Sequence, residues 1–213
     1  MKKNNYSYVG LSFVLLVFGI WVVNEYGSRS EEKALVKFEK VPEFAFTNQE
    51  GVTISNKDFQ GKVYVVEFFF TTCPTICPVM TQNTLLLQHK FYGNPNFGIA
   101  SISINPKHDS PNVLKAYAQE KGATLENWHF LTGDETEIFD FSNKGFKLYA
   151  GVNEAVEGGF EHSGLFALID KQGYIRSRTI KIGDNENPIK FYDGLDVSAI
   201  EMLKEDIQLL LNE

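Results

Sequence analysis

The stretch Thr71-Thr72-Cys73-Pro74-Thr75-Ile76-Cys77-Pro78 contains the only two cysteines in this chain of 213 residues. The run Val63 to Phe70 before it is apolar except for Glu67, which is typical of a strand buried on both faces. The leucine-rich stretch after it predicts a helix, and Pro78 suits a helix start, so Cys77 is expected at or near the N-cap. Both sulfurs would then lie where a helix dipole favours thiolate. The pattern therefore predicts a reactive or metal-binding thiol pair and not two cysteines that merely pack.

The rest of the chain alternates strand-like and helix-like segments. An N-terminal β-hairpin is expected over residues 43–54, and further strands over 97–104, 128–131, 165–170 and 174–180. Helices are expected after Pro78 and over residues 110–122, 134–149 and 197–211. This order predicts an α/β domain with a mainly parallel central sheet flanked by helices. A cysteine pair at the end of its first central strand is the thioredoxin-like arrangement.

The N-terminal segment predicts a membrane anchor. Residues 4–24 include no charged side chain and would span roughly 30 Å as a helix, which matches the hydrocarbon core of a bilayer. A cleaved signal peptide is the alternative, but no small-x-small cleavage site follows the apolar run. We therefore expect a single transmembrane helix within an anchor over 1–26, a tether over 27–40 and a thioredoxin-like domain over 41–213. Lys2 and Lys3 favour a cytoplasmic N-terminus, which puts the domain on the extracytoplasmic (periplasmic) side of the cell membrane.

The charge balance argues against nucleic acid as a partner. The formal net charge is −7, and no basic patch stands out along the chain.

Of the four histidines, His162 is the best candidate for a site residue. It follows a stretch with two glycines, Gly158 and Gly159, and precedes a predicted strand. In a thioredoxin-like sheet the loop before that strand faces the cysteine turn. The other three histidines are expected to have no role at the site: His89, His108 and His129.

These motifs resemble the Sco/SenC family of membrane-anchored copper proteins. The matching segments are residues 71–78, 103–117, 127–133 and the His162-Ser163 pair with the strand after it. The resemblance implies a thioredoxin-like fold that binds copper through Cys73, Cys77 and His162. It also implies delivery of copper to the copper A site of cytochrome c oxidase, or reduction of that site's thiols. The implied partners are the copper-site subunit or another cuproprotein, and a thiol reductant.

Two departures from the family pattern concern the type of copper. Many members have aspartate where this chain has Thr75 and Asn105. Two thiolates and an imidazole suit Cu(I) and are also able to hold Cu(II). Both changes remove negative charge near the site, so the sequence predicts a copper site for Cu(I) and leaves open whether Cu(II) is held as well.

The alternative function is a thiol–disulfide oxidoreductase or a redox-signalling protein of the cell envelope. Its main support is Glu67, an acid within the first central strand, six residues before Cys73. Thioredoxins have a buried aspartate at this offset. Burial should raise the pKa of Glu67 well above the ~4.3 of free glutamate and make it a proton acceptor for the thiols. Against this function, no proline occurs near His162, where thioredoxins place one.

Overall fold

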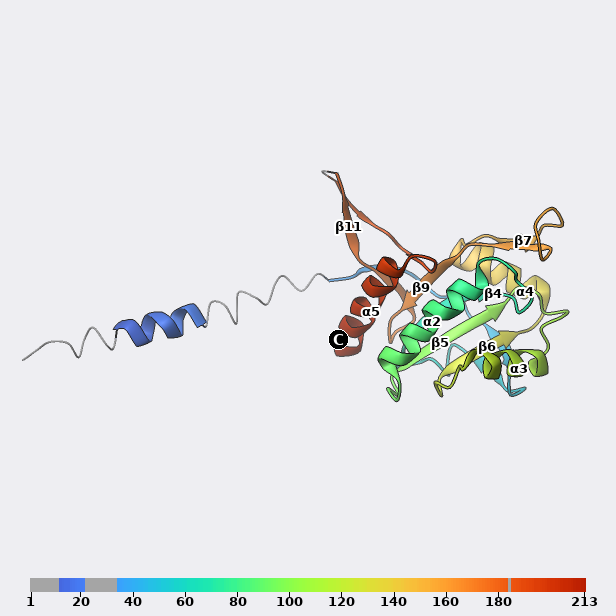
Figure 1. Ribbon diagram of the computed structural model, residues 1–213, viewed down its shortest axis with the longest axis horizontal. Coiled ribbons are helices and arrows are strands. Elements are labelled where there is room, and N and C mark those ends of the chain that lie inside the picture. The colour runs from blue at the N-terminus through green and yellow to red at the C-terminus, as the bar shows by residue number, and fades with distance from the viewer. Residues whose placement is uncertain (1–11, 22–33, 184) are drawn as a thin grey trace, which may run out of the picture. The chain divides into compact units, whose positions relative to one another are not determined.

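The computed structural model describes residues 12–21, 34–183 and 185–213 (Figure 1). The chain divides into two compact units, Met1–Ala34 and Leu35–Glu213. In the first unit, residues 12–21 are helical, and the remainder of the predicted span 4–24 lies outside the described residues. Within the ranges described, no helix combines the length and apolar character that a membrane crossing requires. The anchor therefore stays a prediction.

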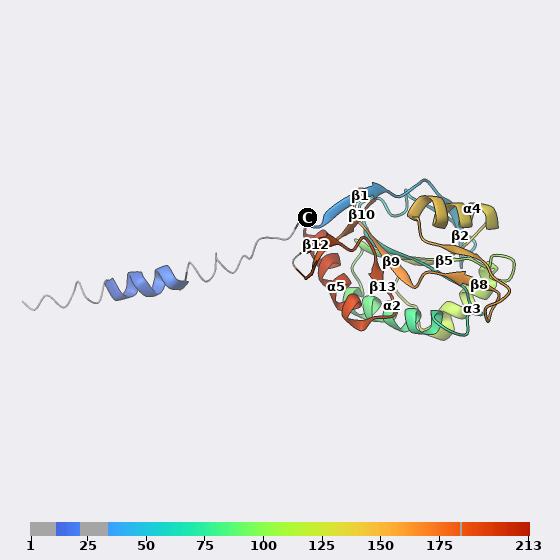
Figure 2. The ribbon, with the colours of Figure 1, turned by 90° about the horizontal axis from the view of Figure 1, so that it is seen from above.

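The second unit is built on a nine-stranded mixed sheet (Figure 2). At its centre, β4 (Val63–Phe69) pairs in parallel with β5 (Phe97–Ser103), and β5 pairs in parallel with β6 (Trp128–Thr132). Every other pairing in this sheet is antiparallel. The six outer strands that make these pairings are β1 (Val36–Lys40), β2 (Ala45–Asn48), β3 (Thr53–Ser55), β9 (Leu165–Ile169), β10 (Tyr174–Ser177) and β13 (Tyr192–Asp193). The prediction of a mainly parallel sheet is therefore wrong, because hairpins flank the parallel centre on both sides.

The edge strand β1 changes the predicted start of the domain. Val36 and Lys37 pair with Ser177 and Arg176 of β10, within the segment that the sequence assigns to a tether. The buried Arg176 guanidinium also donates to the carbonyl of Leu35. The folded unit accordingly begins at Leu35, six residues earlier than the predicted boundary at residue 41.

Helices cover both faces of the sheet. Figure 2 shows α2 (Cys77–Phe91) and α5 (Val197–Asn212) on one face and α4 (Glu135–Asp140) on the other. The helix α3 (Pro111–Lys121) has Ser110 as its N-cap, as predicted. The predicted helix 134–149 is shorter, since a π-helical turn η1 (Phe141–Phe146) follows α4 and Lys147 then adopts a left-handed backbone with φ of 60°.

Two small hairpins lie outside the main sheet and were absent from the prediction. One pairs β7 (Ala150–Val152) with β8 (Phe160–His162), and the other pairs β11 (Thr179–Ile182) with β12 (Asn185–Pro188). The first hairpin matters for function because it carries His162.

The core lies around β4. All seven residues of β4 are buried, and so is Met80 on α2. The cysteine turn therefore follows directly from a fully buried central strand.

Candidate metal centre

The cysteine turn joins the end of β4 to the start of α2. Ile76 is the N-cap of α2, so Cys77 is its first residue and Pro78 the second, which confirms the predicted position. Both sulfurs are buried, with Cys73 at 8% exposure and Cys77 at 1%. Cys73 is therefore the thiol that a partner reaches more easily, and Cys77 lies at the positive end of the α2 dipole.

His162 completes a group of three ligands. The sulfurs of Cys73 and Cys77 and a ring nitrogen of His162 all lie within 4.8 Å of one another. Cys77 Sγ lies 3.2 Å from His162 Nε2. His162 occupies the last position of β8, where it pairs with Ala150 of β7.

The hydrogen bonds of His162 fix which ring nitrogen faces the sulfurs. His162 Nδ1 lies 3.0 Å from the carbonyl oxygen of Ser163. Because a carbonyl only accepts hydrogen bonds, Nδ1 carries the hydrogen and Nε2 presents its lone pair to the thiols. This is the tautomer that a metal ligand needs, with its second nitrogen oriented by a neighbouring acceptor.

The two thiols have opposite tendencies to ionise. The neighbouring Cys77 thiol lowers the pKa of Cys73 against the effect of burial. The neighbouring Cys73 and burial raise the pKa of Cys77. The pair therefore holds one negative charge readily, and that charge resides on the more exposed Cys73.

Aromatic residues close the site on the side of β8. The ring of Phe70 contacts His162 edge-on at a centroid distance of 6.0 Å and Phe160 at 5.4 Å. Gly158 has a φ of 91°, and a β-carbon there would lie 3.1–3.2 Å from Phe70 and Pro74. The glycine therefore allows the β7–β8 loop to lie directly against the cysteine turn.

Glu67 lies behind the thiols and outside the ligand group. Its carboxylate accepts hydrogen bonds from Ser101 Oγ at 2.6 Å and from Thr84 Oγ1 at 3.2 Å. Ser101 in turn accepts from the indole nitrogen of Trp128 at 2.9 Å. Burial raises the pKa of Glu67 to about 7, although these two hydrogen bonds oppose the rise. The predicted upward shift is confirmed, and the role of proton acceptor stays a prediction.

Asp109 is a residue of the site region that the sequence did not reveal. It is fully buried and accepts hydrogen bonds from the backbone N–H and hydroxyl of Thr71 and from the hydroxyl of Ser103. Exposed His108 contacts the same carboxylate at 2.8 Å. Asp109 thus fixes the residue two positions before Cys73. Its sequence neighbourhood is polar and looks like an ordinary loop.

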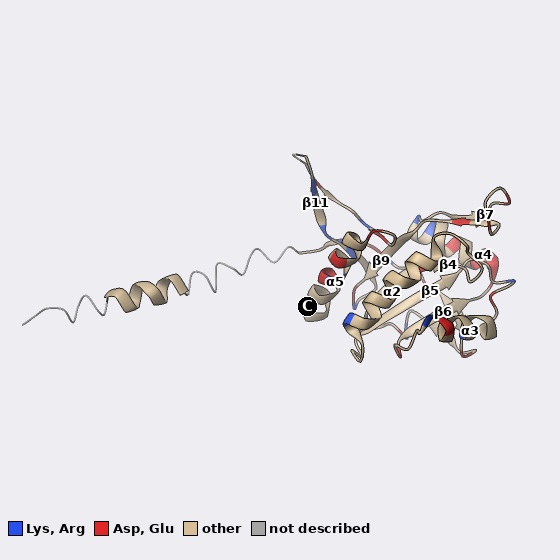
Figure 3. Cartoon of the chain, viewed as in Figure 1, with Lys and Arg blue, Asp and Glu red and all other residues tan. Residues whose placement is uncertain are grey.

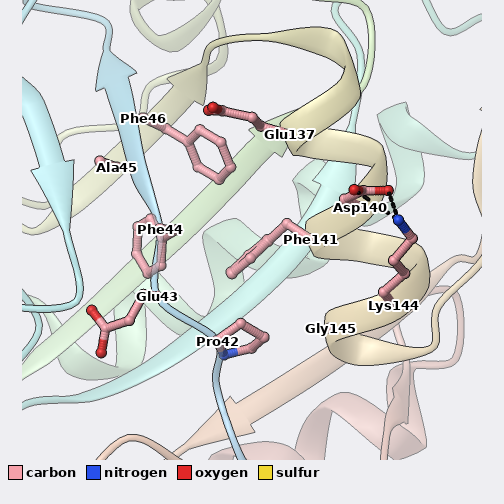
Figure 4. A pocket seen from close by; sticks show the side chains of 10 residues that line it. All are labelled: Pro42, Glu43, Phe44, Ala45, Phe46, Glu137, Asp140, Phe141, Lys144 and Gly145. Carbon is pink, nitrogen blue, oxygen red and sulfur yellow. Dashed lines mark hydrogen bonds and ion pairs between the residues drawn. The ribbon is translucent and has the colours of Figure 1, made fainter.

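The remaining histidines lie away from the thiols. His89 is exposed, and His129 contacts Asn48 and Phe59. A pocket between β2 and the α4–η1 segment has a floor of Phe44, Phe46 and Phe141 (Figure 4). It includes none of the three ligands.

Comparisons with known proteins agree with this site. The SCO1/SenC family model matches residues 32–193. The SCO1 protein homolog of Bacillus subtilis is 32% identical over 171 residues, which covers 79% of this chain and 81% of that protein. The structure of BsSco, described as a member of the Sco family of cytochrome c oxidase assembly proteins with a disulfide switch, aligns with a TM-score of 0.68 at 30% identity. That alignment covers 83% of this chain and 95% of BsSco. Copper-bound ScoI of Bradyrhizobium japonicum shares the fold, with a TM-score of 0.63 at 21% identity over 81% of this chain and all of ScoI.

Proposed function

Since this chain belongs to the SCO1/SenC family, we propose that it is a copper chaperone whose Cys73, Cys77 and His162 bind Cu(I). Its client is then the copper A site of cytochrome c oxidase, in keeping with the description of BsSco as a member of a family of cytochrome c oxidase assembly proteins. The observation that carries the proposal is the convergence of two thiols and one imidazole within 4.8 Å at the family's motif positions.

The donor set fits Cu(I). Thiolate and imidazole are soft and borderline ligands, and three of them match a low-coordinate monovalent ion better than the tetrahedral site that structural zinc requires. Among the described residues, no histidine, cysteine or carboxylate adds a fourth ligand to this group. The Nε2 lone pair already faces the sulfurs, so binding needs only the loss of the thiol protons.

A titration of the reduced fragment 30–213 with Cu(I) tests this proposal. We expect one copper per chain, and an affinity loss of roughly a hundredfold or more, about 2.7 kcal/mol, for Cys73→Ser and for Cys77→Ser. His162→Ala should weaken binding less, and His129→Ala serves as the matched control. Full affinity after either serine substitution would refute the ligand assignment.

We also propose that residues 4–24 hold the domain on the extracytoplasmic side of the membrane. The uncharged run and the two preceding lysines support this topology. A reporter that is active only outside the cytoplasm, fused after Glu213, should be active. A soluble mature chain that begins after Val23 would replace the anchor with a cleaved signal peptide.

Thiol–disulfide exchange is the second candidate function, and the buried Glu67 favours it. A carboxylate with a pKa of about 7 is able to accept the proton that leaves a thiol near neutral pH. If it does so, Glu67→Gln should slow reaction with a small disulfide near pH 7 and leave the final Cu(I) affinity at high pH unchanged. Stopped-flow rates from pH 5 to 9 decide this, and superimposable profiles would leave Glu67 a structural residue.

A further inference from the structure

Apolar side chains are exposed beside the ligands on the α2 side. Val79, in the first turn of α2, is 46% exposed, and Leu195 is 40% exposed. A β-carbon built on Gly164 would lie 3.3 Å from the Leu195 side chain and 3.8 Å from that of Ile76. Leu195 and Ile76 therefore lie together beside Gly164, two residues after the ligand His162.

The β7–β8 hairpin adds another apolar side chain on the same side as the ligand. Val152 pairs directly with Phe160, and directly paired residues of antiparallel strands share a face. Phe160 packs on Phe70 and, two positions before His162, shares its face of β8. Val152, which is 56% exposed, therefore lies on the ligand face of the hairpin. We call Ile76, Val79, Val152 and Leu195 the apolar ring.

Acidic side chains accompany the apolar ring, and basic ones do not. The segments 71–83, 149–166 and 191–198 carry the ligands and the ring, and they contain no lysine or arginine. They contain five exposed carboxylates: Glu154, Glu157, Glu161, Asp193 and Asp196. Figure 3 shows acidic residues on the β7–β8 hairpin, at the end of the sheet toward which β4 and β5 run. Lys107, on the neighbouring loop, is paired with Glu135 at 2.6 Å.

Glu161 alternates with His162 along β8 and therefore lies on the opposite face of the hairpin. We propose that the apolar ring and the other four carboxylates form the docking surface for the protein that exchanges copper with Cys73, and that this partner presents apolar side chains flanked by lysine or arginine. The inference rests on the proposed function, because copper passes between proteins only when a partner's ligand reaches the buried thiols. Ile76 lies between the two cysteines, and Val79 follows Cys77 in the first turn of α2. Exposed apolar groups rimmed by polar ones are typical of protein interaction sites.

The charge also selects against other occupants. A second copy of this chain would bring the same four carboxylates to the contact, and an anionic lipid surface would be repelled likewise. A basic partner is steered toward the opening over long range, and the apolar ring then contributes the short-range contact.

Copper transfer to two synthetic peptides tests the docking surface. Both peptides carry a Cys-x-x-x-Cys pair beside a leucine, one flanked by lysines and the other by glutamates. With the full-length, Cu(I)-loaded protein in nonionic detergent, transfer to the lysine peptide should be about tenfold faster at low salt, and the difference should shrink as salt is added. Equal rates for the two peptides would overturn the proposal.

Paired variants locate the effect on the surface. Glu154→Gln with Glu157→Gln should lower the rate for the lysine peptide roughly three- to tenfold, since each charge contributes to steering. The control is Glu126→Gln with Glu186→Gln, which removes two exposed carboxylates outside these segments. Glu126 lies just before β6, at the N-terminal end of the parallel strands, whereas the cysteine turn follows their C-terminal end. Val79→Asn should slow transfer more than Leu86→Asn, which alters an exposed residue farther along α2. If the control variants slow copper transfer as much as the test variants do, the assignment of the docking surface is refuted.

Two further measurements separate this inference from the proposed function. Cu(I) affinity, measured by competition with a chelator, should be the same in all these variants, so that a change in rate reports docking alone. Binding of the same peptides to the reduced, copper-free protein, followed by fluorescence anisotropy, should also favour the lysine peptide. If copper does not bind, the proposed function fails, and the anisotropy preference still decides whether the docking surface exists.

Discussion

Glu67→Gln should change how the stability of the domain depends on pH. In the folded protein, burial raises the pKa of Glu67 from 4.5 to about 7. A group whose pKa is raised by folding stabilises the fold below its unfolded pKa, and this stabilisation is lost as pH rises through the folded pKa. The rise corresponds to roughly 3 kcal/mol that the native protein loses between about pH 4.5 and pH 8.

Glutamine keeps the shape of the side chain and removes the titration. Its amide oxygen is able to accept from Ser101 as the carboxylate does, and its N–H group can donate to the hydroxyl of Thr84. The free energy of unfolding of the variant, relative to wild type, should therefore rise by roughly 3 kcal/mol between pH 5 and pH 8.5.

Urea unfolding of the fragment 30–213 measures this difference. Fluorescence of the buried Trp128 reports the transition, and both chains should carry Cys73→Ser and Cys77→Ser so that thiol titration does not contribute. Glu126→Gln, an exposed carboxylate, is the matched control and should leave the pH profile unchanged. Parallel profiles for wild type and Glu67→Gln would refute the argument that burial controls this carboxylate.

Two other substitutions test the groups that hold the ligands in place. Asp109→Asn should destabilise the domain by about 2–3 kcal/mol and weaken Cu(I) binding, because an amide cannot accept every hydrogen bond from Thr71 and Ser103. Urea unfolding measures the stability and copper titration measures the affinity, with Asp140→Asn, which changes an exposed carboxylate, as the control. Equal losses of stability and affinity in the two variants would contradict the expected role of Asp109. Asn143→Ala removes hydrogen bonds of 2.8 and 3.0 Å to Ala150 of β7 and should cost about 1–2 kcal/mol. It should also speed hydrogen exchange in β7–β8 and lower Cu(I) affinity, and unchanged exchange at His162 would show that Asn143 does not support that strand.

The sequence predicted the centre of the fold because the relevant signals are local. The largely apolar run before Cys73 corresponds to β4, and Ser110 is the N-cap of α3, as the Ser-Pro pair indicates. The direction of the outer strands was not predictable from local patterns. Strand periodicity does not encode the partner of a strand, so the antiparallel flanks of the sheet and the pairing of β1 came from the structure.

The site was predictable only where a motif marks it. Cys73, Cys77 and His162 converge as the family resemblance implies, and Glu67 is buried with a raised pKa as its apolar neighbours indicated. Asp109 was missed because a buried carboxylate in a polar loop is indistinguishable by sequence from an exposed one. Its burial depends on Thr71, a contact partner 38 positions away in the sequence.

The two-stranded pairing of β7 with β8 has a consequence for the strength of copper retention. Both sulfurs follow the central strand of the main sheet, whereas the imidazole is attached to a hairpin of three residue pairs that shares no strand with it. The hairpin is held to the rest of the domain by the contact of Phe160 with Phe70 and by the hydrogen bonds of Asn143 to Ala150. Separating His162 from the thiols would break these few contacts without unfolding the main sheet. Under the proposed function, the protein would then change from three copper ligands to two while its core stays intact, and the contacts of the hairpin would set how firmly the ion is retained.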